Sequence, residues 1–163
     1  MGLSGCTSAL KPANANSIFD RLEIKGKIGL YTFGWDENKP EEFRKVYADD
    51  IVFKTWTPGK KKLRGEVKGI QANIDRNNVM IGGLLKRGGA CRHNLSEVVF
   101  LDLTKSTAKT KTVYTFSLFP KIGVNPIIIS GTFNDNWIKS EKGWFIKDRE
   151  VIYDNLPAAL AKR

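Results

Sequence analysis

The sequence is poor in metal-binding and redox residues, and each shortage excludes a class of protein. Its 163 residues include one histidine, His93, and two cysteines, Cys6 and Cys91, with no C-x-x-C pair, so a multi-histidine metal site and a disulfide scaffold are excluded. The longest apolar run, over residues 79–85, is interrupted by two glycines and is far shorter than the ~18 residues that span a bilayer. We expect no metal, no cofactor and no membrane-spanning helix.

The composition is that of an ordinary globular domain, with 41% hydrophobic and 27% charged residues. The length corresponds to one domain, since domains commonly hold ~100–200 residues. The net charge of +10 could attract nucleic acid, anionic lipid or acidic substrates. Its densest run, 60–64, follows the turn-forming pair Pro58-Gly59 and is interpreted as a solvated loop. No nucleic-acid recognition motif accompanies it, so nucleic acid is not the expected partner.

The N-terminus leaves the location of the protein open. Residues 1–16 are aperiodic and are expected to form a flexible tail. Within them, Leu3-Ser4-Gly5-Cys6 resembles a lipoprotein cleavage box, although no basic and apolar leader precedes it. Location is therefore unknown: cytoplasmic, or periplasmic or envelope if the box is genuine. The only membrane association we consider is a lipid on Cys6.

Apolar spacing predicts three helices in the N-terminal half. Ser17 is suited to cap the first, which ends at Asp36 and whose inner face repeats at positions i, i+4, i+7 and i+11 (Ile24, Ile28, Tyr31 and Trp35). Pro40 starts a short second helix that runs through Tyr47. A strand is expected over 51–57, and a third helix over 67–80, ending before a pair of glycines.

Four long β-rich segments follow, over 92–103, 107–119, 127–139 and 143–153. Strands of this length in succession predict a strongly curved antiparallel meander, because flat sheets of long strands pack poorly. Helices followed by a sheet are typical of an α+β fold with the helices on one face. The domain is expected over 17–155, with 156–163 as a short C-terminal tail or helix.

A curved sheet wrapped over helices favours a concave apolar pocket, and two side chains could supply chemistry there. Histidine is the residue type best suited to proton transfer near neutral pH, and His93 begins the first long strand. Asp36 ends the first helix, where the helix dipole disfavours a carboxylate. A carboxylate beside an imidazole fixes its tautomer and makes it a usable general base. Local sequence does not show whether the two meet.

Several stretches, in this order, resemble a SnoaL-like domain of the NTF2-like superfamily: Asp20 to Tyr31, Trp35-Asp36, Glu42 to Phe53, Arg92-His93-Asn94-Leu95, Gly131 to Asp135 and Gly143 to Arg149. The resemblance covers roughly residues 17–153. It implies a cone-shaped half-barrel with three N-terminal helices packed in a curved antiparallel sheet. It also implies a homo-oligomer, dimer or trimer, and the exposed outer face of the sheet is the surface we expect it to use.

Within the superfamily, the chain resembles the scytalone dehydratase and hexachlorocyclohexane dehydrochlorinase type, which abstracts a proton with an Asp–His pair. The resemblance assigns the catalytic roles to Asp36 and His93. It matches Arg149 to a basic pocket residue and Asn134 to a pocket asparagine with a one-residue uncertainty. Tyr31 stands where the dehydrochlorinase has a lysine, and the dehydratase's second strand histidine is missing.

The resulting hypothesis is a cofactor-independent lyase or isomerase of the dehydratase or cyclase type. Trp35, Trp56 and Tyr114 would form aromatic walls around a small apolar, even polycyclic substrate. The alternative is a non-catalytic NTF2-like ligand-binding or accessory module, or an envelope lipoprotein. Cys91 lies two residues from His93, but side chains at i and i+2 stand roughly parallel on a strand, so it is not favoured as a nucleophile.

Overall fold

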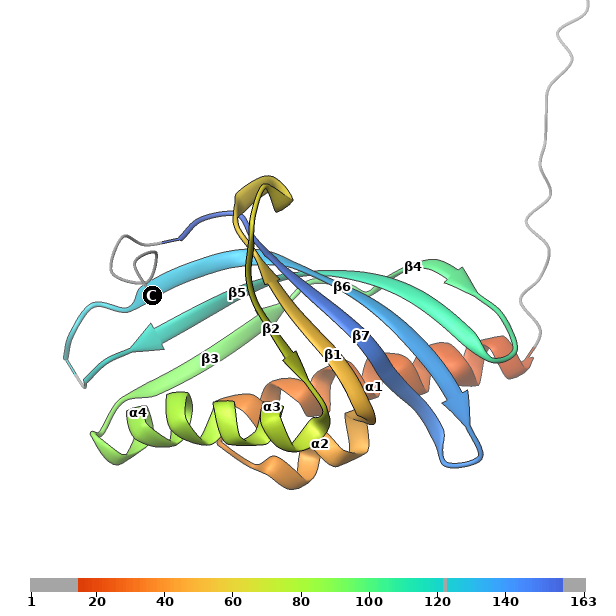
Figure 1. Cartoon of the computed structure of the whole chain (residues 1–163), viewed down its shortest axis with the longest axis horizontal. Helices are drawn as coiled ribbons and strands as arrows, with labels where there is room; N and C mark the ends of the chain where they lie inside the picture. The colour runs from red at the N-terminus through yellow and green to blue at the C-terminus, as the bar shows by residue number, and fades with distance from the viewer. Residues whose placement is uncertain (1–14, 122, 157–163) are drawn as a thin grey trace, which may run out of the picture.

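The computed structural model describes residues 15–121 and 123–156, with helices laid along one face of a curved sheet (Figure 1). The predicted α+β architecture is confirmed. The predicted N-terminal tail up to residue 14, the Cys6 box and residues 157–163 lie outside the described residues. In chain order the elements are α1 (Ala15–Asp36), α2 (Pro40–Val46), β1 (Tyr47–Trp56), a 3₁₀ turn (Pro58–Lys60), β2 (Leu63–Lys68), α3 (Ile70–Asn77), a π-helical segment (Asn78–Gly82), α4 (Gly83–Lys86), β3 (Ala90–Leu95), β4 (Val99–Leu103), β5 (Thr107–Phe119), β6 (Ile127–Ser140) and β7 (Gly143–Tyr153).

The sheet is mixed rather than wholly antiparallel, which corrects the predicted topology. Its strand order is β2-β1-β7-β6-β5-β3, with β4 also paired to β5. Strands β5, β6 and β7 form the expected antiparallel meander. Strand β1, however, lies parallel to β7, with Phe53 opposite Arg149. The basic run 60–64 was predicted to be a loop. Its last two residues instead belong to β2, because Leu63–Lys68 pairs with β1.

The single strand predicted over 92–103 is two strands. β3 pairs with the second half of β5, and β4 pairs with its first half. Between them, Ser96 donates its backbone N–H to the oxygen of Val113, whereas the N–H of Val113 is accepted by Ser96 Oγ in place of a backbone carbonyl. A break at this point lets the short strands follow the bend of β5.

Two helix boundaries also differ from the prediction. α1 begins at Ala15, so Ser17 lies inside the first turn and is not its cap. The third helical stretch starts at Ile70 instead of residue 67 and continues through Gly82 and Gly83 to Lys86. Both glycines hold helical dihedral angles there, so this pair does not break the helix.

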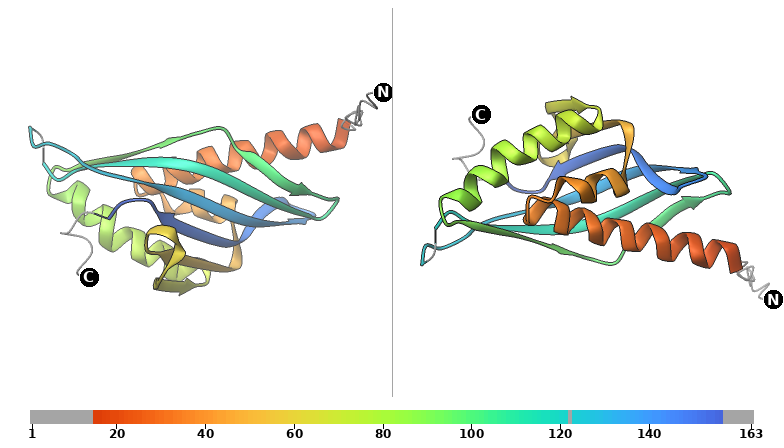
Figure 2. Two further views of the ribbon diagram at one scale, coloured as in Figure 1. Left: turned by 90° about the horizontal axis from the view of Figure 1, so that it is seen from above. Right: turned by 90° about the horizontal axis from the view of Figure 1, so that it is seen from below.

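α1 runs along the concave face of the sheet, and α2 and the α3–α4 stretch lie beside it (Figure 2). Its predicted inner face is fully used, since Ile24, Ile28 and Tyr31 are each no more than 2% exposed. Among the described residues, no helix combines the length and the apolar character needed to cross a membrane.

A bulge in β7 decides which of its side chains face α1. Trp144 and Ile146 are buried, and after the register shift opposite Asn136/Trp137 the buried side chains are Arg149 and Val151. Because side chains alternate along a strand, an uninterrupted β7 would turn Arg149 to the outer face. The extra residue turns it into the core.

We predict opposite effects of alanine at two glycines. A Cβ at Gly131 would collide with the carbonyl oxygen of Ile152 and lie 2.7 Å from the hydroxyl of Tyr114, whereas a Cβ at Gly29 on α1 would meet nothing within 4 Å. Gly131→Ala should therefore lower the free energy of unfolding in a denaturant titration. Gly29→Ala should raise it by up to ~1 kcal/mol, the difference between the two residues in a helix interior. Equal effects would contradict the packing around Gly131.

Candidate active site

The structure brings Asp36 and His93 into direct contact. His93 Nδ1 lies 2.6 Å from Asp36 Oδ1, and the backbone N–H of His93 donates to Asp36 Oδ2 at 2.8 Å. The two side chains are only 1% and 5% exposed. An ionised carboxylate can only accept hydrogen bonds, so the contact places the ring hydrogen on Nδ1 and leaves Nε2 of a neutral ring with its lone pair free.

The position of His93 at the sheet edge explains this geometry. β3 is the last strand of the sheet, so its outer backbone N–H groups have no neighbouring strand. The C-terminus of α1 ends against this edge, and the Asp36 carboxylate accepts a hydrogen bond from one of these N–H groups, that of His93. The two hydrogen bonds offset the unfavourable placement of a carboxylate at a helix C-terminus.

Aromatic rings surround the imidazole. Phe116, the cross-strand neighbour of His93, has its ring centroid 4.5 Å from that of the imidazole, and Tyr31 contacts it edge-on at 5.8 Å. Trp35, Tyr114 and Phe133 lie between 6.1 and 6.3 Å away. Tyr31, Trp35 and Tyr114, predicted to line the site, therefore do lie around His93.

A buried ion pair lies on the other side of Tyr31. Arg149 donates through Nε and Nη2 to the two carboxylate oxygens of Asp135, both at 2.7 Å, and neither side chain is exposed. The guanidinium lies 4.1 Å from the ring centroid of Tyr31 and 4.4 Å from that of Phe133. Burial acts to lower the pKa of Arg149, but the Asp135 carboxylate outweighs it and the pKa is raised, so Arg149 stays charged.

Three buried polar atoms of this interior lack a hydrogen-bond partner among the described residues: Arg149 Nη1, Tyr47 Oη and Tyr114 Oη. An unpaired buried polar group costs about 1–3 kcal/mol and calls for an explanation. Burial raises the pKa of both tyrosines above the ordinary value, and burial also raises that of Tyr31 to about 12, with Arg149 opposing it. All three hydroxyls are therefore neutral and able to donate near pH 7.

Two residues predicted to bind substrate lie elsewhere. Asn134 is on the opposite face of β6 from its buried neighbours Phe133 and Asp135. Trp56 alternates with the buried Thr55 on β1, and its ring lies 5.1 Å from Lys60 Nζ at the end of the strand. Neither is joined to His93 by any contact within the part of the chain that the structure describes.

The thiol of Cys91 is buried, and its Sγ lies 3.7 Å from both the backbone oxygen and Oδ1 of Asp36. Burial, and then the neighbouring carboxylate, raise the pKa of Cys91 to about 12. A thiol that stays protonated is a poor nucleophile, which agrees with the sequence-based expectation.

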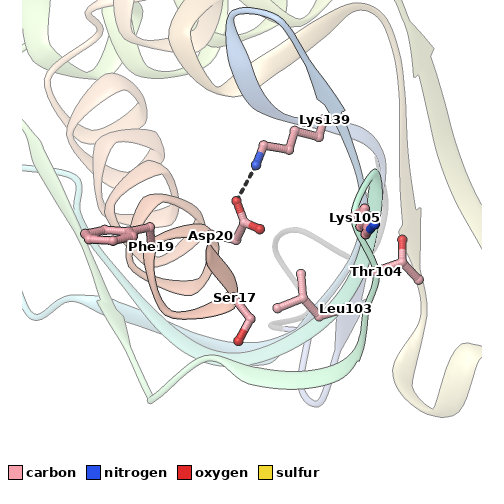
Figure 3. Close-up of a pocket in the computed structure, with 7 residues that line it drawn as sticks. All are labelled: Ser17, Phe19, Asp20, Leu103, Thr104, Lys105 and Lys139. Atoms are coloured by element: carbon pink, nitrogen blue, oxygen red, sulfur yellow. Dashed lines mark hydrogen bonds and ion pairs between the residues drawn. The ribbon is translucent and has the colours of Figure 1, made fainter. Parts of the chain in front are cut away.

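The sequence predicted a concave pocket beside His93, but in the structure aromatic side chains pack against the imidazole. A hollow of about 570 Å³ lies instead at the other end of α1, where Asp20 and Lys139 form an ion pair at its wall (Figure 3). A second, of about 320 Å³, lies between α1 and β4. Neither is lined by Asp36 or His93.

Sequence reasoning missed two charged residues of the interior. Asp135 was hidden by the choice of its neighbour Asn134, although the apolar alternation of β6 could have identified it. Arg76 of α3 is half-buried, with its guanidinium 4.9 Å from the ring centroid of Phe53 and 5.8 Å from that of Trp35. It forms no ion pair with an acidic side chain among the described residues, and its sequence context gives no signal.

The profile of the SnoaL-like domain matches residues 16–150, most of the chain. The protein belongs to the SnoaL-like family. Comparison with curated protein sequences gives no match.

Solved structures share the fold of this SnoaL-like protein at low sequence identity. A scytalone dehydratase-like protein from Novosphingobium aromaticivorans has a TM-score of 0.70 at 18% identity, covering 84% of this chain and 85% of its own. A hexachlorocyclohexane dehydrochlorinase from Novosphingobium barchaimii has a TM-score of 0.71 at 12% identity, covering 89% and 93%. An NTF2-like superfamily protein from Salmonella enterica has a TM-score of 0.67 at 14% identity, covering 87% and 96%.

We predict that the buried ion pair is essential for stability. Asp135→Asn removes the charge that compensates Arg149 and should lower the free energy of unfolding by about 3–5 kcal/mol, as measured by denaturant titration. The adjacent substitution Asn134→Asp, on the outer face of β6, is the matched control and should have little effect. A similar loss in both variants would contradict the assigned orientations.

Cys91 should make the protein less stable at alkaline pH. An unfolded thiol releases its proton near pH 9, whereas the folded thiol keeps it to about 12, so the free energy of unfolding falls as pH rises between these values. In a Cys6→Ser background, Cys91→Ala should make this fall less steep in titrations at several pH values. The folded thiol should also react slowly with a disulfide reagent at pH 8; rapid reaction without unfolding would contradict its burial.

Proposed function

We propose that this SnoaL-like protein is a lyase or isomerase in which His93 is the general base and Asp36 orients it. The contact of 2.6 Å between Nδ1 and the carboxylate carries the proposal. It fixes the tautomer, holds the ring and stabilises the imidazolium that forms when Nε2 takes a proton. A positioned base of this kind contributes about 10²–10⁴-fold to a rate.

The proposed reaction starts at a C–H bond next to an electron-withdrawing group. Nε2 takes the proton, and the electron pair of the bond moves onto the substrate. In an elimination the pair forms a double bond and a leaving group departs with its own electrons; in an isomerisation the imidazolium returns the proton to another carbon. Both the elimination and the isomerisation balance in atoms and electrons without a cofactor.

The unpaired donors of the interior would stabilise the negative charge that develops. Arg149 is held by Asp135 through two nitrogens, and Nη1 remains for a substrate oxygen or leaving group. Tyr114 has a neutral hydroxyl and lies on the same side of the sheet as His93. Fixed donors in an apolar interior act strongly on developing charge.

The surrounding rings favour a small, apolar substrate with a planar or polycyclic body. Phe116, Tyr31 and Tyr114 are the rings nearest to the imidazole, and Trp35 lies slightly farther away. These rings also occupy the space beside it, so the substrate must enter by moving at least one of them. Phe116 is only partly buried, whereas Trp35 is 8% exposed, so Phe116 is the ring of this wall most exposed to solvent.

A second candidate function is ligand binding without chemistry. The tight packing around Asp36 and His93 favours it, because this packing leaves little room for a substrate beside the imidazole. The side chains of Asp36 and His93 are almost wholly buried, and the larger hollow lies at the other end of α1. In this function the Asp–His contact serves to fasten α1 to β3. The two functions make different predictions for a carbon acid probe.

We predict proton abstraction from an activated, flat carbon acid such as 5-nitrobenzisoxazole, whose deprotonation opens the ring to a coloured phenolate. His93→Gln should lower the rate at least 100-fold and Asp36→Asn at least tenfold, because the first removes the base and the second its orienting group. Asn134→Ala, on the outer face of β6, is the control and should react at the wild-type rate. Absorbance of the product measures each rate.

Circular dichroism and denaturant titration would show that each variant is folded. Equal rates for the wild type and His93→Gln would overturn the general-base proposal. Saturable binding of the probe by the wild type without product formation would support the ligand-binding function.

A further inference from the structure

α1 has two apolar faces, and the fold covers only one of them. The inner face, with Ile24 and Ile28, is buried against the sheet. On the opposite side of the same helix, four large apolar side chains are exposed by 36–68% of their surface: Phe19, Leu22, Leu30 and Phe33. A helix that is apolar on both sides is normally covered on both.

The exposed face is symmetrical about one residue. Leu22 and Leu30 lie four residues before and after Gly26, and Phe19 and Phe33 lie seven residues before and after it. Steps of four and seven return to the same side of an α-helix. These five residues, here named the outer stripe, therefore have the same order of side chains in either chain direction: Phe, Leu, Gly, Leu, Phe.

Glycine at the centre of the stripe has no explanation within one molecule. A Cβ at Gly26 would meet nothing within 4 Å, and the same holds for Gly29 at the edge of the stripe. Glycine lowers helix stability relative to alanine, so alanine would serve a monomer better at both positions. Small residues on a helix face let a second helix approach closely.

Charges next to the stripe are directed away from it. Lys25 donates to Glu97 at 2.6 Å, and Lys27 donates to the backbone oxygen of Lys45 at 2.8 Å. The two lysines that flank Gly26 are thus held by partners of their own chain. The stripe itself contains no charged residue, so two such stripes could meet without burying a charge.

We propose that the outer stripe is a homodimer interface in which the α1 helices of two copies pack antiparallel about a two-fold axis at Gly26. This arrangement places Leu22 against Leu30 of the second copy and Phe19 against Phe33 of the second copy. A two-fold interface must be self-complementary, and a palindromic stripe meets that condition. It is a different surface from the outer sheet face expected from the sequence, and the proposal does not depend on the proposed function.

A hollow beside the stripe fits this arrangement. The cavity of about 320 Å³ between α1 and β4 is lined by Ile18, Leu22, Val98, Phe100 and the stems of Arg21 and Lys25. In the antiparallel pair, Leu30 and Phe33 of the second copy lie next to it and can fill it. With these contacts the pair would bury on the order of 1,000 Å² in total, about the minimum for a specific interface.

Leu22→Glu tests the proposal, and Leu101→Glu on β4 is its matched control, since the two leucines are 60% and 63% exposed. Light scattering after size exclusion, over a range of protein concentrations, should show a dimer for the wild type and for Leu101→Glu. Leu22→Glu should weaken the dimer at least a hundredfold. A wild type that is monomeric up to 100 μM, or equal behaviour of the two variants, overturns the proposal.

Two further variants test the register and guard against misfolding. Gly26→Ala should weaken the dimer at least tenfold while raising the thermal midpoint of the monomer, a combination that a folding defect cannot produce. Leu30→Lys alone should be monomeric, but an equimolar mixture with Leu22→Glu should form a heterodimer, because only the antiparallel register places these two positions opposite each other. Failure of the mixture to associate would overturn the antiparallel arrangement.

Discussion

The carboxylate of Asp36 joins the C-terminus of α1 to the edge strand β3. One oxygen holds a backbone amide at the edge of the sheet, and the other holds the ring of His93. The helix end, the strand and the imidazole are therefore fixed by one group. Since the amide contact limits how far the carboxylate can turn, the ring has little freedom in either position or tautomer.

The interior around this contact combines tight packing with unsatisfied polarity. Rings of Tyr31, Phe116 and Phe133 fill the space, whereas the ion pair of Arg149 and Asp135 places two charges where an apolar pair would be no less stable. A chain selected for stability alone would not be expected to keep a buried guanidinium with one unpaired nitrogen. The arrangement is what a site requires when charge must be stabilised away from water.

Much of the fold could be predicted from periodicity, but the details that orient the site could not. The inner stripe of α1 and three of the long strands followed directly from apolar spacing. The match of Asn134 carried an uncertainty of one residue, which on a strand reverses the face. The bulge that turns Arg149 inward leaves no clear local signal, and the parallel pairing of β1 with β7 depends on residues about one hundred positions apart. The meeting of Asp36 with His93 was likewise expected from resemblance and not from local pattern.

The parallel pairing of β1 and β7 has a consequence for how the protein acquires its structure during synthesis. β1 and the helices before it are made early, yet the neighbour that covers one whole edge of β1 is the last strand described. Contacts of such long sequence separation form slowly. On the ribosome, the unpaired backbone edge of β1 must therefore wait for nearly the entire described chain to emerge, and an unpaired strand edge is open to misassociation during that time.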